Sequence, residues 1–103
     1  MRFAGFEYIR ERGELRWSGK LVALQEQPMR LLGLLLERPG EIVSRERIRE
    51  VLWKHRHGDH EHGINTAVRK LRGVLEPAKA SGLRIATSAG ARSPVLLLAN
   101  FRN

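Results

Sequence analysis

Residues 59–77 of this chain read DHEHGINTAVRKLRGVLEP. Apolar residues recur in this segment every three or four positions, which is the period of an α-helix with one buried face. Asp59 is the expected N-cap of the helix, and Pro77 is expected to end it because proline cannot continue the backbone hydrogen bonding. The face toward the core is expected to consist of Ile64, Val68, Leu71 and Leu75.

The opposite face of this helix carries polar and basic residues. Arginine can donate two hydrogen bonds to guanine, asparagine can pair with adenine, and the methyl group of threonine can contact that of thymine. A helix of about 16 residues is roughly 24 Å long, which is enough to lie across a major groove. A solvated helix face without a ligand fits the same pattern equally well. The residues of this face are His62, Asn65, Thr66, Arg69 and Lys70, with Arg72 at its flank.

Two further helices are expected upstream. Residues 25–40, QEQPMRLLGLLLERPG, have apolar residues at helical spacing, with Pro28 in the first turn and a Pro-Gly pair at the end. Residues 41–53, EIVSRERIREVLW, predict a short extended pair and then a helix with Ser44 as N-cap and Glu46 in its first turn. Two short helices joined by a turn form a helix-turn-helix, which favours DNA binding by the third helix. The expected core residues are Met29, Leu32, Leu35 and Leu36 in the first helix, and Ile48, Val51 and Leu52 in the second.

Both ends of the chain are expected to form β-structure. Residues 2–24 alternate apolar and polar residues between turns at Arg12-Gly13 and Ser18-Gly19, which predicts two or three antiparallel strands. Residues 83–99 predict a hairpin with strands at 83–87 and 95–98. A hairpin after a helix-turn-helix is a wing, and Arg92 at its tip is placed to reach a minor groove or a phosphate.

The predicted fold class is therefore α+β, a winged helix-turn-helix with an N-terminal antiparallel sheet, three helices and a C-terminal β-hairpin wing. One domain is expected to span residues 1–103. Its parts are the sheet at residues 2–24, the three-helix core at 26–76 and the wing hairpin at 83–99.

Composition narrows the possible functions. Lysine and arginine outnumber aspartate and glutamate by 19 to 11, which gives a net charge of +8 and favours a polyanionic partner over charge that only maintains solubility. No segment has the roughly 20 apolar residues that span a bilayer, and no signal peptide is visible, so we expect a cytoplasmic protein without a membrane partner. The absence of cysteine excludes disulfides and thiolate metal sites.

Four segments resemble one known family. GELRWSGKLVAL (13–24), LLERPGEIVSRERIREVLW (35–53), HEHGINTAVRKLR (60–72) and IAT (85–87) are similar, in order and in spacing, to the OmpR/PhoB-type winged-helix effector domains of response regulators. The resemblance covers residues 2–90. It implies a four-stranded N-terminal sheet, and transcriptional control by binding to tandem half-sites on double-stranded DNA. It also implies a homodimer on DNA and contact with RNA polymerase through the loop before the third helix.

The resemblance also assigns roles to single residues. His62, Asn65, Thr66, Arg69 and Lys70 occupy the positions that face the major groove in the family. Arg45 and Trp53 match phosphate-binding positions of the family, and Arg72 matches a basic position that contacts phosphate or braces the helix. Thr87 matches a threonine at the base of the wing, and Arg92 is the expected residue at the tip of the wing. The segment GARSPVLLLANF (90–101) departs from the Gly-Tyr-Arg-Phe-like strand of the family, because Ser93 and Pro94 stand where the family has its tyrosine and arginine.

All four histidines lie in one short segment, at His55, His57, His60 and His62. Imidazoles at this spacing can hold zinc, nickel or copper weakly. The resemblance gives a different explanation, since HEHGIN is similar to the start of the family's third helix. We therefore expect neither a metal nor a cofactor. A further hypothesis is that protonation of these histidines strengthens DNA binding at mildly acid pH.

Two other function classes were compared with DNA binding. A winged-helix module for protein contacts, with weak and unspecific DNA affinity, is the alternative if the hairpin residues Leu96 and Leu98 are exposed. An enzyme is not expected. Ser44, Asp59 and the histidines are not accompanied by a nucleophile elbow, a glycine-rich phosphate loop or paired catalytic carboxylates.

Overall fold

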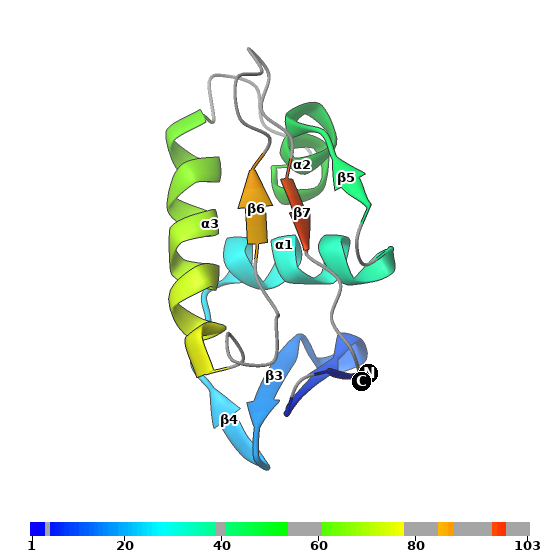
Figure 1. Ribbon diagram of the computed structural model, residues 1–103, viewed down its shortest axis with the longest axis vertical. Helices are drawn as coiled ribbons and strands as arrows, with labels where there is room; N and C mark the ends of the chain where they lie inside the picture. The colour runs from blue at the N-terminus through cyan, green and yellow to red at the C-terminus, as the bar shows by residue number, and fades with distance from the viewer. Residues whose placement is uncertain (4, 39–40, 54–60, 78–84, 88–95, 99–103) are drawn as a thin grey trace.

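The computed structural model describes residues 1–3, 5–38, 41–53, 61–77, 85–87 and 96–98, and for 61, 62, 86, 87 and 96–98 it describes the backbone only (Figure 1). Seven strands, three α-helices and one short 3-10 helix make up this part of the chain. In chain order they are β1 (Arg2–Phe3), β2 (Phe6–Ile9), the 3-10 helix η1 (Arg10–Arg12), β3 (Glu14–Trp17), β4 (Lys20–Val22), α1 (Glu26–Glu37), β5 (Ile42–Val43), α2 (Arg45–Leu52), α3 (Glu61–Val74), β6 (Ile85–Thr87) and β7 (Leu96–Leu98).

The N-terminal sheet has four antiparallel strands in the order β1-β2-β3-β4. The family resemblance implied four strands, and this number is confirmed. The alternation of residue types predicted two or three strands, and that number is wrong. The reason is that β1 has only two residues, too few to show a period of two. Ser18 (φ 50°) and Gly19 (φ 82°) form the two-residue turn from β3 to β4, with the positive φ values that such hairpins need.

Helix α1 crosses the middle of the molecule, between the N-terminal sheet on one side and α2 and the second sheet on the other, while α3 runs along one edge past α1 (Figure 1). The predicted core residues Met29, Leu32, Leu35 and Leu36 are all buried. Leu31 and Leu34 are buried as well, which the single predicted stripe did not include. A helix that is packed on several sides has a wider apolar face than a surface helix, which buries a single stripe.

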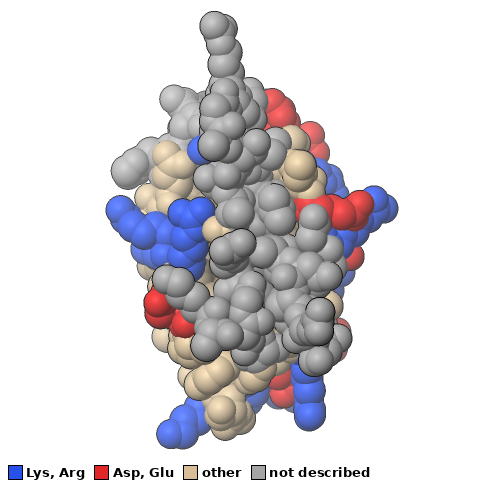
Figure 2. Space-filling model, viewed as in Figure 1, with Lys and Arg blue, Asp and Glu red and all other residues tan. Residues whose placement is uncertain are grey.

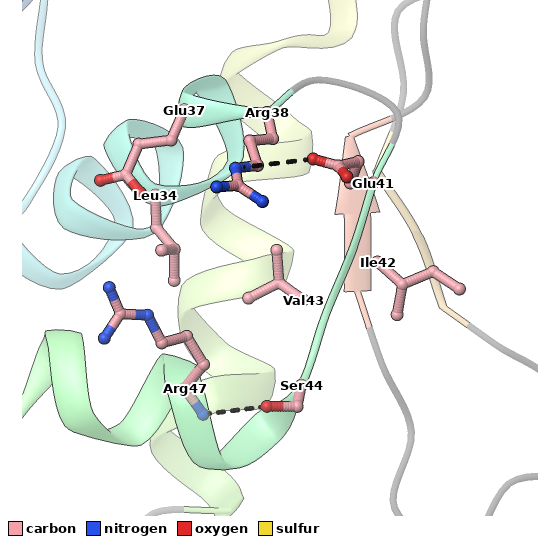
Figure 3. Close-up of a pocket in the computed structure, with 8 residues that line it drawn as sticks. All are labelled: Leu34, Glu37, Arg38, Glu41, Ile42, Val43, Ser44 and Arg47. Carbon is pink, nitrogen blue, oxygen red and sulfur yellow. Dashed lines mark hydrogen bonds and ion pairs between the residues drawn. The ribbon is translucent and has the colours of Figure 1, made fainter.

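The predicted start of α2 is confirmed at the level of single atoms. Ser44 Oγ accepts a hydrogen bond from the backbone N–H of Arg47 at 3.2 Å (Figure 3), and Glu46 lies in the first turn. Ile48 and Leu52 are buried and Val51 packs against the core, as expected. Arg30 Nη1 of α1 donates to the backbone oxygen of Leu52 at 3.4 Å and so satisfies a carbonyl at the other end of α2.

Helix α3 buries the predicted stripe. Ile64, Val68, Leu71 and Leu75 are all buried, and Ala67 between them is buried too. The structure describes the 14 residues Glu61–Val74 as helical, about 21 Å at 1.5 Å per residue. The expected N-cap Asp59 lies outside the described residues.

The second sheet joins segments that are far apart in the sequence. Strand β7 lies between β5 and β6 and is antiparallel to both, with Leu97 paired to Ile42 and to Ala86. The extended pair Ile42–Val43 and the hairpin of the two wing strands were predicted, and the antiparallel pairing of β6 with β7 confirms the hairpin. The pairing of β5 with β7 was not predicted. The rest of the predicted hairpin, including Arg92, lies outside the described residues, as do the Pro-Gly pair 39–40 and residues 93 and 94.

Replacement of Leu71 by alanine tests the importance of the α3 stripe. Leu71 is 0 % exposed, so Leu71→Ala should lower the free energy of unfolding by roughly 2–5 kcal/mol through lost burial and the cavity left behind. Leu21→Ala is the matched control, because Leu21 on β4 is 61 % exposed and its loss should change stability by at most about 0.5 kcal/mol. Urea unfolding measures both variants. Equal losses would contradict this description of the core.

Candidate nucleic-acid interface

The exposed face of α3 gathers the residues that the sequence singled out. Asn65, Arg69 and Lys70 are exposed and Thr66 is half-buried, opposite the buried stripe, and Arg72 is exposed at the flank of this face. Lysine and arginine side chains cluster at the left edge of Figure 2, where Figure 1 shows α3. The helix therefore presents hydrogen-bonding and basic groups to solvent along one side. The side chain of His62 is not among those described.

Asn65 is bonded to the neighbouring helix. Arg45 Nη2 donates to Asn65 Oδ1 at 2.9 Å, which joins the first residue of α2 to the exposed face of α3. Arg45 is half-buried, and its Nε and Nη1 atoms are buried. The two helices of the helix-turn-helix are thus linked by a charge-assisted hydrogen bond beside the candidate interface.

Two other basic residues on α3 also donate to protein atoms. Arg72 Nε donates to the backbone oxygen of Ile85 at 3.1 Å and so ties the helix to strand β6 of the wing. Lys70 Nζ donates to Oε1 of Gln25, in the segment just before α1. Arg69, in contrast, pairs with no residue in the part of the chain that the structure describes. Arg69 is therefore the α3 guanidinium that is free to meet a ligand.

Trp53 packs directly on the first turns of α3. A Cβ atom placed on Gly63 would lie 2.7 Å from Cζ2 and 2.9 Å from Cη2 of the Trp53 ring. Real Cβ atoms essentially never come that close, so this position needs a glycine unless the ring moves. The indole ring of Trp53 thus fixes the approach of α3 to the end of α2.

A hollow of about 500 Å³ opens between the end of α1, β5 and the start of α2 (Figure 3). Its charged side chains already have partners. Arg38 pairs with Glu41 at 3.8 Å, as Figure 3 shows, while Glu37 pairs with Arg10 and Arg47 with Glu50 outside the view. Because these charges neutralise one another, the hollow offers no concentrated charge to an ionic ligand, and the α3 face remains the stronger candidate.

Comparison with known proteins decides the family. Residues 19–91 match the family described as transcriptional regulatory protein, C terminal. The chain belongs to this family. It is a DNA-binding domain of the winged helix-turn-helix type found in response regulators, as its sequence indicated, and that family is not a class of enzymes.

Individual relatives agree with this assignment. The chain is 36 % identical over 69 residues to the DNA-binding dual master transcriptional regulator RpaA of Synechocystis, a match that covers 67 % of this chain and 29 % of RpaA. The chain therefore spans less than a third of the length of this relative.

Solved structures share the fold over nearly the whole chain. The DNA-binding domain of CpxR from E. coli superposes with a TM-score of 0.81 at 24 % identity, over 99 % of this chain and 97 % of that domain. The DNA-binding domain of the response regulator AdeR, solved in complex with an intercistronic region, has a TM-score of 0.70 at 17 % identity, over 96 % of this chain and 98 % of that one. Both likenesses lie below 25 % identity and show the fold alone.

The described residues bear on two expectations, the absence of a metal site and the absence of a membrane partner. Within the described ranges no group of three or more histidine, aspartate or glutamate side chains could hold a metal ion. His55, His57 and His60 lie outside those ranges, so the prediction about the histidine cluster stays a prediction. None of the helices in the described part of the chain is both long enough and apolar enough to cross a membrane.

Two glycines of α3 allow a matched test of the Trp53 contact. Alanine has the higher helix propensity by about 1 kcal/mol, so Gly73→Ala, which meets no atom within 4 Å, should stabilise the domain by up to that amount. Gly63→Ala should instead destabilise it and alter the tryptophan emission, because the Trp53 ring must move. Urea unfolding followed by fluorescence measures both. A similar gain in stability for both variants would show that the Trp53 ring can move at no cost.

Proposed function

We propose that this domain binds double-stranded DNA sequence-specifically, with α3 in the major groove. The observation that carries the proposal is the division of α3 into a fully buried apolar stripe and an exposed face of base-reading residues. A helix about 21 Å long fits a groove about 12 Å wide, with its side chains toward the base edges. The net charge of +8 supplies long-range attraction to the phosphates.

The major-groove residues are proposed to divide the reading between them. Arg69 has a free guanidinium, which suits two hydrogen bonds to guanine, and Thr66 offers a methyl group and a hydroxyl. Asn65 and Lys70 share the same exposed face, each with a bond to a neighbouring segment. His62 is proposed for this group from its position in the helix alone.

Residues around α3 are proposed to set the orientation on DNA without reading bases. Arg72 is proposed to brace α3 against the wing, because its Nε already donates to strand β6. Trp53 lies beside the start of α3, where an indole N–H suits a phosphate. The phosphate contact of Arg45 and the wing contact of Thr87 stay predictions from the family resemblance, and the contact of Arg92 stays a prediction from its place at the tip of the predicted hairpin.

We also propose the partners, the location and the extent of the domain. The DNA complex of AdeR supports duplex DNA as the partner, since the same fold is used there. Binding as a homodimer to paired half-sites and contact of the loop before α3 with RNA polymerase are proposed from the family resemblance alone. A cytoplasmic location is proposed for a regulator that binds DNA. We also propose that residues 1–103 form one winged-helix domain.

Fluorescence anisotropy of labelled duplexes with randomised sequence tests the function. The log of the binding constant should fall linearly with the log of the salt concentration, with a slope of several units because several phosphates are neutralised. Selection of the tightest duplexes should yield a defined site. Absence of binding at low salt would contradict the proposal and would favour the alternative of a module for protein contacts.

Arg69→Ala should weaken binding to the selected site by about 1–3 kcal/mol and relax selectivity at one base pair, because two hydrogen bonds to that base are lost. Arg12→Ala is the control for charge alone, since Arg12 is exposed on η1 of the N-terminal sheet. Both variants lose one positive charge, and only the first should change the base preference. An unchanged preference for Arg69→Ala would remove Arg69 from the reading residues.

A further inference from the structure

The bond between Arg45 and Asn65 restricts what Asn65 can present to DNA. Arginine carries hydrogen-bond donors and no acceptor, so the atom of the Asn65 amide that faces Nη2 at 2.9 Å must be the oxygen, Oδ1. The orientation of the amide is therefore fixed by chemistry. Its nitrogen end, with two N–H donors, is the end not held by Arg45.

Arg45 is itself held firmly enough to impose this orientation. It is the first residue of α2, and the cap from Ser44 Oγ to the backbone N–H of Arg47 fixes the turn that carries it. Its side chain is half-buried, with Nε and Nη1 buried and Nη2 directed to Asn65. The guanidinium is thus anchored in the protein, and its bond to an amide oxygen is stronger than a bond between two neutral groups.

The consequence concerns which base Asn65 selects. Asparagine reads adenine by donating to N7 and accepting from N6 at the same time, which needs both ends of the amide. Oδ1 has two lone pairs, but one accepts from Arg45, and the oxygen is directed toward α2. The end of the amide left to meet a base is then the NH2 group, whose donors match guanine, since O6 and N7 are both acceptors. We propose that Arg45 is a positioning residue that makes Asn65 prefer guanine to adenine at the base pair it meets. This inference rests on the proposed binding of α3 in the major groove.

The competing role for Arg45 is a direct bond to a DNA phosphate, as the family resemblance implies. The two roles differ in what they control. A phosphate contact adds affinity for every sequence and increases the salt dependence, whereas a positioning residue changes the preference for one base. Base preference and salt slope, measured on the same variants, therefore separate them.

The experiment uses residues 1–103 and four duplexes that differ at one base pair of the selected site. That base pair is the one at which Asn65→Ala flattens the preference. Wild type should favour guanine over adenine there. Arg45→Ala should shift the guanine-to-adenine ratio of binding constants about tenfold toward adenine, since Oδ1 becomes free to accept from N6.

Two further variants complete the test. Arg45→Ala combined with Asn65→Ala should show the same flat preference as Asn65→Ala alone, because Arg45 acts through Asn65. Arg45→Lys keeps a donor without an acceptor, so it should keep the guanine preference. Thermal unfolding checks that each variant is folded. Arg45→Met, which keeps most of the side-chain length but has no donor, takes the place of Arg45→Ala if Arg45→Ala does not fold, with the same expected shift toward adenine.

Each outcome decides the proposal. A tenfold shift that disappears in the double variant supports it. An unchanged ratio in Arg45→Ala, together with a salt slope reduced by about one, would overturn it and assign Arg45 to a phosphate. If wild type binds specifically but does not favour guanine at the Asn65 base pair, only this inference fails. If wild type does not bind DNA at low salt, the proposed function fails and the inference fails with it.

Discussion

Burial of the apolar stripe of α3 against α1 is the constraint on which the rest of the structure depends. Ile64 and Leu71 are completely buried, and each such side chain contributes about 1.5–3 kcal/mol relative to an exposed one. A helix that buries one face has no freedom to rotate about its axis. The rotation that buries Ile64 and Leu71 therefore exposes Asn65 and Arg69, so the energy that folds the domain also sets which residues face outward.

Hydrophobic burial fixes the rotation of α3 but sets its tilt and height less sharply, because it has little directional preference. Polar bonds provide that direction at three points. Asn65 is joined to α2, Lys70 to the segment before α1 and Arg72 to strand β6. Each bond contributes only about 1 kcal/mol. Together they hold the helix from three sides before any ligand arrives, which lowers the entropy that binding must spend on ordering it.

Much of this arrangement could be predicted from the sequence, because it follows from local patterns. The α3 stripe, the Ser44 cap and the turn at Ser18-Gly19 are all encoded within a few consecutive residues. The Arg45–Asn65 bond is different, since its partners lie 20 residues apart and meet only when two helices cross. Gly63 gave a weaker signal: a glycine inside a helix suggests a close neighbour, but the sequence does not say that the neighbour is Trp53.

A basic side chain can attract a polyanion through its charge and can read a base through its hydrogen-bond donors. A hydrogen bond within the protein uses up donors but leaves the charge. Arg45 and Arg72 each use a guanidinium N–H on a protein oxygen, yet both charges still contribute to the net +8 that attracts a polyanion. Attraction over about 10 Å needs only the charge, whereas reading a base needs free donors in the right direction. The domain can therefore be strongly basic while few of its cations read sequence. Discrimination between sites then depends on the few side chains whose donors are free, and on the neighbours that orient the others.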